Sequence, residues 1–246
     1  MSVELVSSEQ PGGGMSTRKK WLIGCGGCLG LLAVISVVLV IAMSMGWNAL
    51  QKASGGSVKN IFGSTYPASG YVAMGLPLNQ PKMKNLAVLI ATDQSSVVLA
   101  FDTEASPAEM KVLQHGSKAQ LQAYFKTLAA QLLKTAAAQA SSSRLQELQF
   151  TNPRPVTVAG NKQYTVVDTT VQTTGQQAVT TVMPGAVALL PQANNRVVGL
   201  VALAPNAAAE SVSPSFGEEQ TRLATELNEM IQDSELDDRL LPPIKK

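Results

Sequence analysis

The first pattern along the chain is an uncharged, mostly apolar run over residues 21–51, bounded by a basic block before it and Lys52 after it. A helix rises about 1.5 Å per residue, so the residues from Trp21 to Trp47 would extend roughly 40 Å, more than the roughly 30 Å of bilayer hydrocarbon. These are the only two tryptophans in the chain. Indole rings favour the headgroup region at both edges of a membrane. The pattern therefore predicts a membrane-spanning helix over residues 21–47.

Two kinds of processing are alternatives to an uncleaved span. The small residues at 42–44 form a possible signal-peptide cleavage site, although the apolar run exceeds the about 7–15 residues of a signal peptide. Residues 22–25 read like a lipoprotein cleavage box, but they precede the apolar stretch instead of following it. The basic block Arg18–Lys20 favours a cytoplasmic tail. The rest of the protein is then expected outside the cytoplasm.

Small residues inside the span offer a packing surface. Gly26 and Gly30 form a G-x-x-x-G spacing, which lets two membrane helices approach closely and makes self-association an open alternative. The only cysteines, Cys25 and Cys28, form a C-x-x-C at the same edge. A redox pair needs a partly exposed position and zinc needs further ligands. Packing of small residues is therefore the preferred interpretation.

The remaining polar and apolar pattern divides the chain further. We expect a cytoplasmic tail over 1–20, a flexible linker over 48–68, one extracytoplasmic domain over 69–235 and a C-terminal tail over 236–246. Short apolar runs bounded by turn residues predict strands. They cover 71–74, 86–91, 97–101, 145–150, 156–159, 163–173, 177–183, 186–190 and 196–204. Residues 92–95 and the pair Gly160-Asn161 are expected to be hairpin turns.

Helical periodicity interrupts the strands twice. A capping box with proline at the first helical position starts at Ser106, and Ser117 offers a second start after Gly116. The helix from Ser117 is expected to end near Ser141, and another is capped at Ser215. Their apolar stripes are Leu121, Tyr124, Phe125, Leu128 and Leu132 in the first and Leu223, Leu227 and Ile231 in the second.

The fold class is therefore α+β: a single N-terminal transmembrane helix followed by one largely antiparallel sheet with two packing helices, like an α/β/α sandwich. The element order resembles the Mog1/PsbP-like group over about residues 69–233. The matching features are the hairpin at 86–101, the helix after Ser106, the hairpin at 156–173 and the closing helix at 216–233. The resemblance implies a non-catalytic binding or assembly role in a bacterial envelope, and it transfers no site residue.

Few residues suggest catalysis. His115, the only histidine, lies at the expected end of a short helix, and Asp168 interrupts an apolar strand. Both are candidates for function, although a helix-cap histidine and a solvent-facing aspartate are the simpler interpretations. Asp102 and Glu104 are expected to be helix-start charges before Ser106. No catalytic, cofactor or metal motif is present.

The charge and composition of the chain limit the classes of binding partner that we expect. The net charge is +2 and aromatic residues make up 4% of the chain, so nucleic acid is not expected. Acidic residues gather on and after the last helix, as a solvated face or a docking surface for a basic partner. We expect a non-enzymatic binding or assembly module on the bacterial inner membrane, facing the periplasm, with the bilayer and a protein as partners. The alternatives are a structural subunit that assembles through its span, or a weak hydrolase whose pocket gathers two or more of Asp93, Asp102, Asp168 and His115.

Overall fold

The computed structural model describes residues 56–63, 70–76, 83–139, 144–158, 160, 162–174, 180–205 and 214–241. The expected tail and span, with Trp21, Gly26, Gly30 and Trp47, lie outside these residues. Among the helices that the structure does describe, none combines the length and apolarity needed to cross a bilayer.

In the part of the chain that the structure describes, seven strands form one sheet in which every neighbouring pair is antiparallel. The order across the sheet is β1-β2-β3-β7-β6-β5-β4, so two meanders meet where β3 pairs with β7. The strands are β1 (Tyr71–Leu76), β2 (Met83–Ala91), β3 (Val97–Glu104), β4 (Arg144–Thr157), β5 (Gln163–Thr174), β6 (Thr180–Gln192) and β7 (Arg196–Leu203). The α+β class with a largely antiparallel sheet is confirmed.

Both predicted hairpins form. In the first, Ile90 on β2 pairs with Val97 on β3 across the turn. In the second, Thr157 pairs with Gln163, and Gly160 in the connecting loop has a φ of 73°. Glycine adopts positive φ without steric cost, which explains the turn signal at this position.

Two predicted breaks in strands do not occur. We expected separate strands before and after residues 151–155, but β4 runs through them with a bulge between Thr151 and Arg154. It is an edge strand, where proline is tolerated because one side has no neighbouring strand. We likewise expected a break at Pro184, but β6 is continuous, and pairing with β7 begins one residue later at Gly185.

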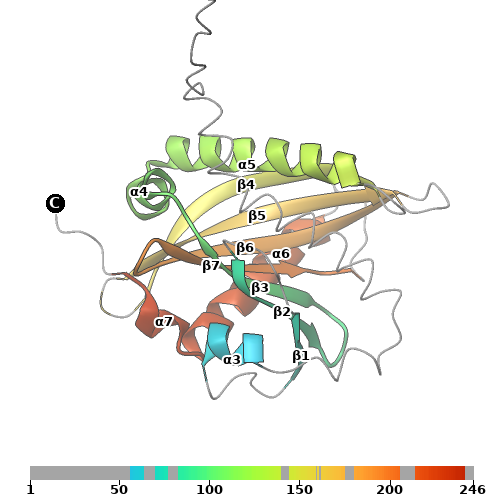
Figure 1. Cartoon of the computed structure of the whole chain (residues 1–246). Coiled ribbons are helices and arrows are strands. Elements are labelled where there is room, and N and C mark those ends of the chain that lie inside the picture. The colour runs from blue at the N-terminus through green and yellow to red at the C-terminus, as the bar shows by residue number, and fades with distance from the viewer. Residues whose placement is uncertain are drawn as a thin grey trace, which may run out of the picture.

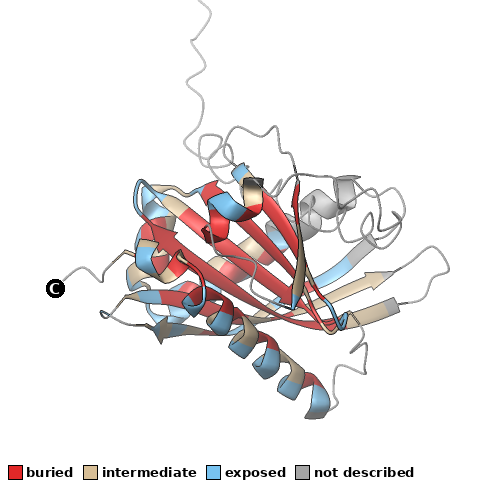
Figure 2. Cartoon of the chain, turned by 90° about the horizontal axis from the view of Figure 1, so that it is seen from below, coloured by how far each residue is buried: buried red, intermediate tan, exposed pale blue. Residues whose placement is uncertain are grey.

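Helices cover both faces of the sheet (Figure 1). On one face lie α4 (Pro107–His115) and α5 (Lys118–Gln139); on the other lie α3 (Gly56–Phe62), α6 (Pro214–Gln232) and α7 (Leu236–Arg239). The buried apolar residues form two main clusters, one under each helical layer. The buried positions line the strands and the inner sides of the helices, while the outer sides are exposed (Figure 2). The structure is thus layered as helix, sheet and helix.

Two of the three predicted helix starts are confirmed, whereas the predicted cap at Ser215 is wrong, because α6 already begins at Pro214 and Ser215 lies inside the helix. Ser106 and Glu109 form the complete capping box of α4, with Pro107 at its start. Ser117 and Gln120 exchange the equivalent hydrogen bonds at the start of α5. On α6, Leu223, Leu227 and Ile231 are all 0% exposed, as the apolar stripe predicts.

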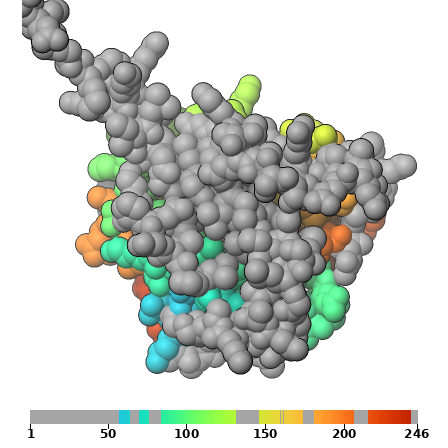
Figure 3. Space-filling model, turned by 45° about the vertical axis from the view of Figure 1, so that its right-hand side comes forward, coloured from blue at the N-terminus to red at the C-terminus, as the bar shows by residue number. Residues whose placement is uncertain are grey.

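The folded part extends beyond the expected 69–235 at both ends. Residues 56–62, inside the segment predicted as a linker, form α3 and bury Ile61 and Phe62 in the core. The helix packs against β2, and the two are seen side by side in Figure 3. At the other end, residues expected to belong to a tail form α7 and bury Leu236 and Leu240. The apolar residues of these short segments supply core that a linker or tail would not.

Polar contacts fasten these two ends to each other. Arg239 donates from Nη1 to the carbonyl oxygens of Asn60 at 3.0 Å and Ile61 at 3.2 Å. A guanidinium there satisfies carbonyls that the end of α3 leaves without helical partners. Lys162 does the same for α7, since its Nζ donates to the carbonyl oxygen of Asp237 at 2.9 Å.

Tyr164 ties the centre of α6 to β5. Its ring is 1% exposed and its hydroxyl donates to Asn228 Oδ1 at 2.6 Å. Burial raises the pKa of Tyr164 to about 12 from an ordinary 10.0. The contribution of this neutral hydroxyl is fully present below about pH 10 and is lost as pH rises toward 12, because the unfolded chain ionises first.

We therefore expect Tyr164→Phe to show a shallower loss of stability between about pH 10 and 12, with the difference approaching 3 kcal/mol. Urea unfolding of both proteins across this interval measures it. The other titrating groups are shared, so their effects cancel in the difference. Parallel stability curves would show that Tyr164 ionises equally easily in both states.

Candidate functional site

A groove lies between α6, along most of its length, and the start of β1 with the end of β2 and the turn that follows it. Its volume is about 650 Å³, and its walls come from Gly70 and Tyr71, from the β2–β3 turn, and from the outer side of α6. The charged groups in its walls are four acids and one base: Asp93, Glu218, Arg222, Glu226 and Glu229. The groove is therefore net acidic by three charges (one positive minus four negative).

Glu226 is the fixed centre of this groove. Its side chain is 11% exposed. Oε1 accepts hydrogen bonds from the hydroxyl of Tyr71, at 2.7 Å, and from the hydroxyl of the buried Ser96. Oε2 faces Arg222 Nη1 at 3.1 Å. Because its oxygens are already paired with protein groups, Glu226 joins β1, the β2–β3 turn and α6 and is not free to act as a base.

Arg222 closes the same network toward solvent. Its Nε donates to Glu219 at 2.9 Å, and Nη2 donates to the carbonyl oxygen of Ser95 in the β2–β3 turn at 3.3 Å. The hydrogen bonds to Glu219, followed by the charges of Glu219 and Glu226, raise the pKa of Arg222, which burial alone would lower. The guanidinium is therefore a permanent cation that holds the turn against α6.

The exposed acids of the groove lie on both sides of this network. Asp93 in the β2–β3 turn accepts from the backbone N–H of Ser95 at 2.9 Å. The hydrogen bonds from Ser95 lower the pKa of Asp93. Glu218 and Glu229 lie on α6 and are exposed. These three carboxylates, unlike Glu226, have solvent access for a ligand in the groove.

The contacts of Asp168 indicate a structural role. Arg154 Nη1 lies 2.7 Å from Asp168 Oδ1, and Asn152 donates to Oδ2 at 3.1 Å. Both partners belong to the bulge of β4, where Asn152 has a φ of 51°. Asp168 therefore pins the bulge to β5 across the ladder, and it does not line the groove.

Asp102 is not a helix-start charge, and that prediction is wrong. It is 2% exposed on β3 and accepts from Arg196 Nε on β7 at 2.8 Å and from Asn85 on β2 at 3.2 Å. Arg196 Nη2 contacts the second carboxylate oxygen as well. Glu104, which was also expected to be a helix-start charge, is exposed on β3, and its Oε1 lies 3.7 Å from Nζ of Lys84 on β2.

The hydrolase alternative requires at least two of its four candidate residues in one pocket, but the fold places these residues on different elements. His115 is exposed at the end of α4, on the opposite face from α6. Of the four groups, only Asp93 lines the groove, and Asp102 and Asp168 are each paired with an arginine. Across the described ranges, no three His, Cys, Asp or Glu side chains cluster closely enough to hold a metal ion.

Sequence reasoning found part of the groove. The acidic character of the last helix was visible, including Glu218, Glu226 and Glu229. Tyr71 and Ser96 were missed because their link to Glu226 spans 155 and 130 residues of chain, respectively. The burial of Ser96 among the turn residues carried no local signal.

No model of a known protein family matches this chain, and no curated protein matches its sequence.

Proposed function

We propose that this protein is a single-pass, membrane-anchored binding module that works without catalysis. Residues 21–47 form the transmembrane helix, the tail lies in the cytoplasm, and the layered domain lies outside it, facing the periplasm of a bacterial envelope. The support for the anchor is the uncharged run bracketed by Trp21 and Trp47, with basic residues at its inner edge.

The acidic groove is the docking site in this proposal, and its ligand is a basic segment of a partner protein. The observation that carries this assignment is the arrangement of exposed Asp93, Glu218 and Glu229 around the fixed Glu226–Arg222 pair. A rigid centre with solvent-exposed carboxylates at its rim suits lysine and arginine side chains. Such contacts attract opposite charge at the rim and weaken with salt.

Titration of the full chain in detergent micelles with a fluorescent lysine-rich peptide tests the groove. We expect saturable binding that weakens about tenfold in the double variant Glu218→Gln with Glu229→Gln, since each exposed charge pair contributes about 0.2–1 kcal/mol and the two act together. The matched control, Asp233→Asn with Asp238→Asn, removes the same charge from exposed positions outside the groove.

Two results would reject the groove as the site: equal weakening by both double variants, or equal binding of a glutamate-rich peptide. The anchor is tested separately by alkaline extraction of native membranes. We expect the full chain to stay in the pellet and a chain lacking residues 21–47 to be released.

A further inference from the structure

The two helical layers of the domain carry opposite charge. Helix α5 contains three lysines and no acidic residue, which gives +3, whereas α6 contains four glutamates and one arginine, which gives −3. The small net charge of the whole chain hides this separation. The difference appears only when the fold places α5 and α6 on opposite faces of the sheet (Figure 1).

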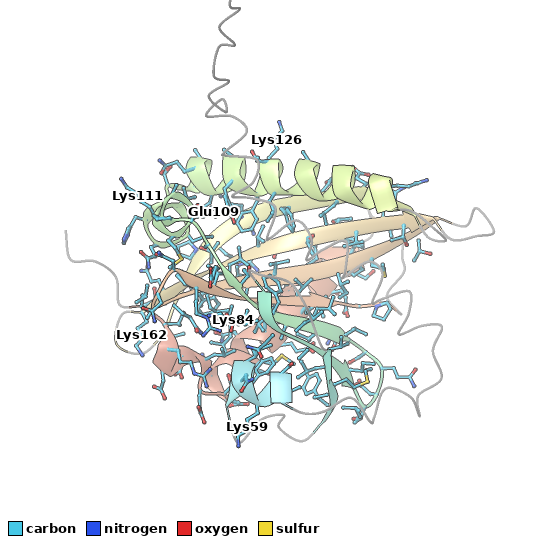
Figure 4. The ribbon with its side chains drawn as sticks, viewed as in Figure 1. Lys59, Lys84, Glu109, Lys111, Lys126 and Lys162 are labelled. Carbon is cyan, nitrogen blue, oxygen red and sulfur yellow. The ribbon has the colours of Figure 1, made fainter. Side chains whose placement is uncertain are left out.

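The basic layer is exposed. Lys111 on α4 and Lys118 and Lys126 on α5 all lie at the surface. In Figure 4, Lys111 and Lys126 point away from the sheet, and Lys59 on α3 lies on the other side of the molecule. None of the ion pairs formed within the described residues includes Lys111, Lys118 or Lys126. The acidic residue nearest to Lys111 in sequence is Glu109, whose carboxylate accepts a hydrogen bond from the backbone N–H of Ser106 at 2.7 Å.

We infer that the α4–α5 layer lies on the anionic headgroups of the membrane in which the protein is anchored. This inference rests on the proposed membrane anchor. A lysine near an anionic leaflet contributes about 1 kcal/mol. Three such residues would bind a free protein weakly, but a tether keeps the domain at a high effective concentration beside the surface. The acidic layer is repelled from the same surface, so both layers favour one orientation.

The tether permits this orientation. Residues 48–55 connect the expected span to α3, and a fully extended chain covers at most about 3.3–3.6 Å per residue, or roughly 30 Å here. Packed layers lie about 10 Å apart, so α3 would stand about 25 Å above a membrane in contact with α5. The same orientation turns the acidic groove away from the lipid and toward a partner.

A membrane surface fits this layer better than a second copy of the chain. The described exposed positions of α5 are lysine, glutamine, threonine and alanine: Lys118, Ala119, Gln120, Gln122, Ala123, Lys126, Thr127 and Ala130. Protein interfaces depend on buried aromatic and arginine anchors, and this surface offers none. Attraction of several lysines to a diffuse anionic surface requires no such anchor.

The test uses the full chain, reconstituted in vesicles with its domain outward and with Cys25 and Cys28 replaced by alanine. A single reporter cysteine is introduced by Ala123→Cys on α5 or by Thr221→Cys on α6 and labelled with a fluorophore. Lipids carrying a nitroxide on the headgroup then quench a label that lies at the surface. We expect quenching of the α5 label to rise about twofold when about 30 mol % phosphatidylglycerol replaces phosphatidylcholine, and to fall again in about 1 M salt. The α6 label should not respond.

Charge variants identify the layer responsible. Lys118→Gln with Lys126→Gln should remove the increase, while Lys59→Gln with Lys84→Gln, an equal charge loss elsewhere, should preserve it. A response of the α6 label, or loss of the effect in the control pair only, would overturn the inference. So would quenching that depends on the protein-to-lipid ratio, which indicates contact between copies. If the α5 label stays unquenched while the chain remains in the membrane and its groove binds peptide, this inference fails and the proposed function stands.

Discussion

Arg196→Leu is expected to lower the free energy of unfolding by about 3–5 kcal/mol, the range for breaking a buried ion pair. The variant leaves the carboxylate of Asp102, which is 2% exposed, without its cation. Among the described residues, the amide of Asn85, at 3.2 Å, is the side-chain donor that would remain. An ionised carboxylate in that environment has lost its hydration and its counter-charge together.

Measurement of this effect requires a cycle of variants, because leucine also changes packing. Urea unfolding of the full chain in micelles is followed for Arg196→Leu, for Asp102→Asn and for the two combined. We expect the combined variant to be more stable than Arg196→Leu, since the amide of asparagine removes the buried charge. The control is Arg222→Leu, the same substitution at a side chain 40% exposed, where a loss below about 1 kcal/mol is expected. Equal losses at the two arginines would contradict the argument.

This network also shows why a local sequence pattern misassigns a residue. Asp102 and Glu104 precede the Ser106 cap, and acidic residues are favoured at helix starts. The ladder instead pairs Asp102 with Val198 and Glu104 with Arg196, so the arginine reaches the aspartate diagonally on the same face. Burial of Arg196, and secondly the nearby cation of Arg239, lowers the pKa of Arg196. The decisive partner, Arg196, comes from β7, which sequence spacing does not place beside β3.

Patterns that depend on short range were predicted well. The capping boxes at Ser106 and Ser117, the turn at Gly160 and the apolar stripe of α6 each depend on residues within one or two turns of one another. The continuity of β4 through Pro153 and of β6 through Pro184 was not predicted, because whether proline breaks a strand depends on which neighbours the strand has. That information is a property of the sheet order, with β4 at its edge.

Short flanking elements were missed for a related reason. The segment containing α3 is rich in glycine and serine, which is typical of a linker. Its three apolar residues, Val58, Ile61 and Phe62, are nevertheless buried to 2% exposure or less. The helix ends at Phe62, and the next residue, Gly63, has a φ of 100° and donates from its backbone N–H to the carbonyl oxygen of Lys59 at 2.9 Å. A seven-residue helix is not stable alone, so its formation depends on the carbonyl contacts of Arg239 and on the core beneath it.

Helix α6 joins the core to the groove, and Leu227→Ala is expected to affect both. Leu227 is 0% exposed in the cluster under α6 and lies next to Glu226 in the chain. Truncation of a buried leucine to alanine lowers the free energy of unfolding by about 2–5 kcal/mol. Thr225→Ala, at an exposed position on the same helix, should change it by less than about 0.5 kcal/mol. Urea unfolding of both variants measures the difference.

The functional consequence follows from how α6 is seated. Glu226 reaches Tyr71 and Ser96 only while the inner side of α6 remains against the sheet, and Arg222 reaches Ser95 on the same condition. Leu227→Ala should therefore weaken binding of the lysine-rich peptide, although Leu227 does not line the groove. Leu227→Met conserves volume and typically costs less than about 1.5 kcal/mol, so it should preserve binding. If Leu227→Ala lost stability but bound the peptide as well as Leu227→Met, the groove would not depend on the seating of α6, and its rim carboxylates alone would account for the attraction.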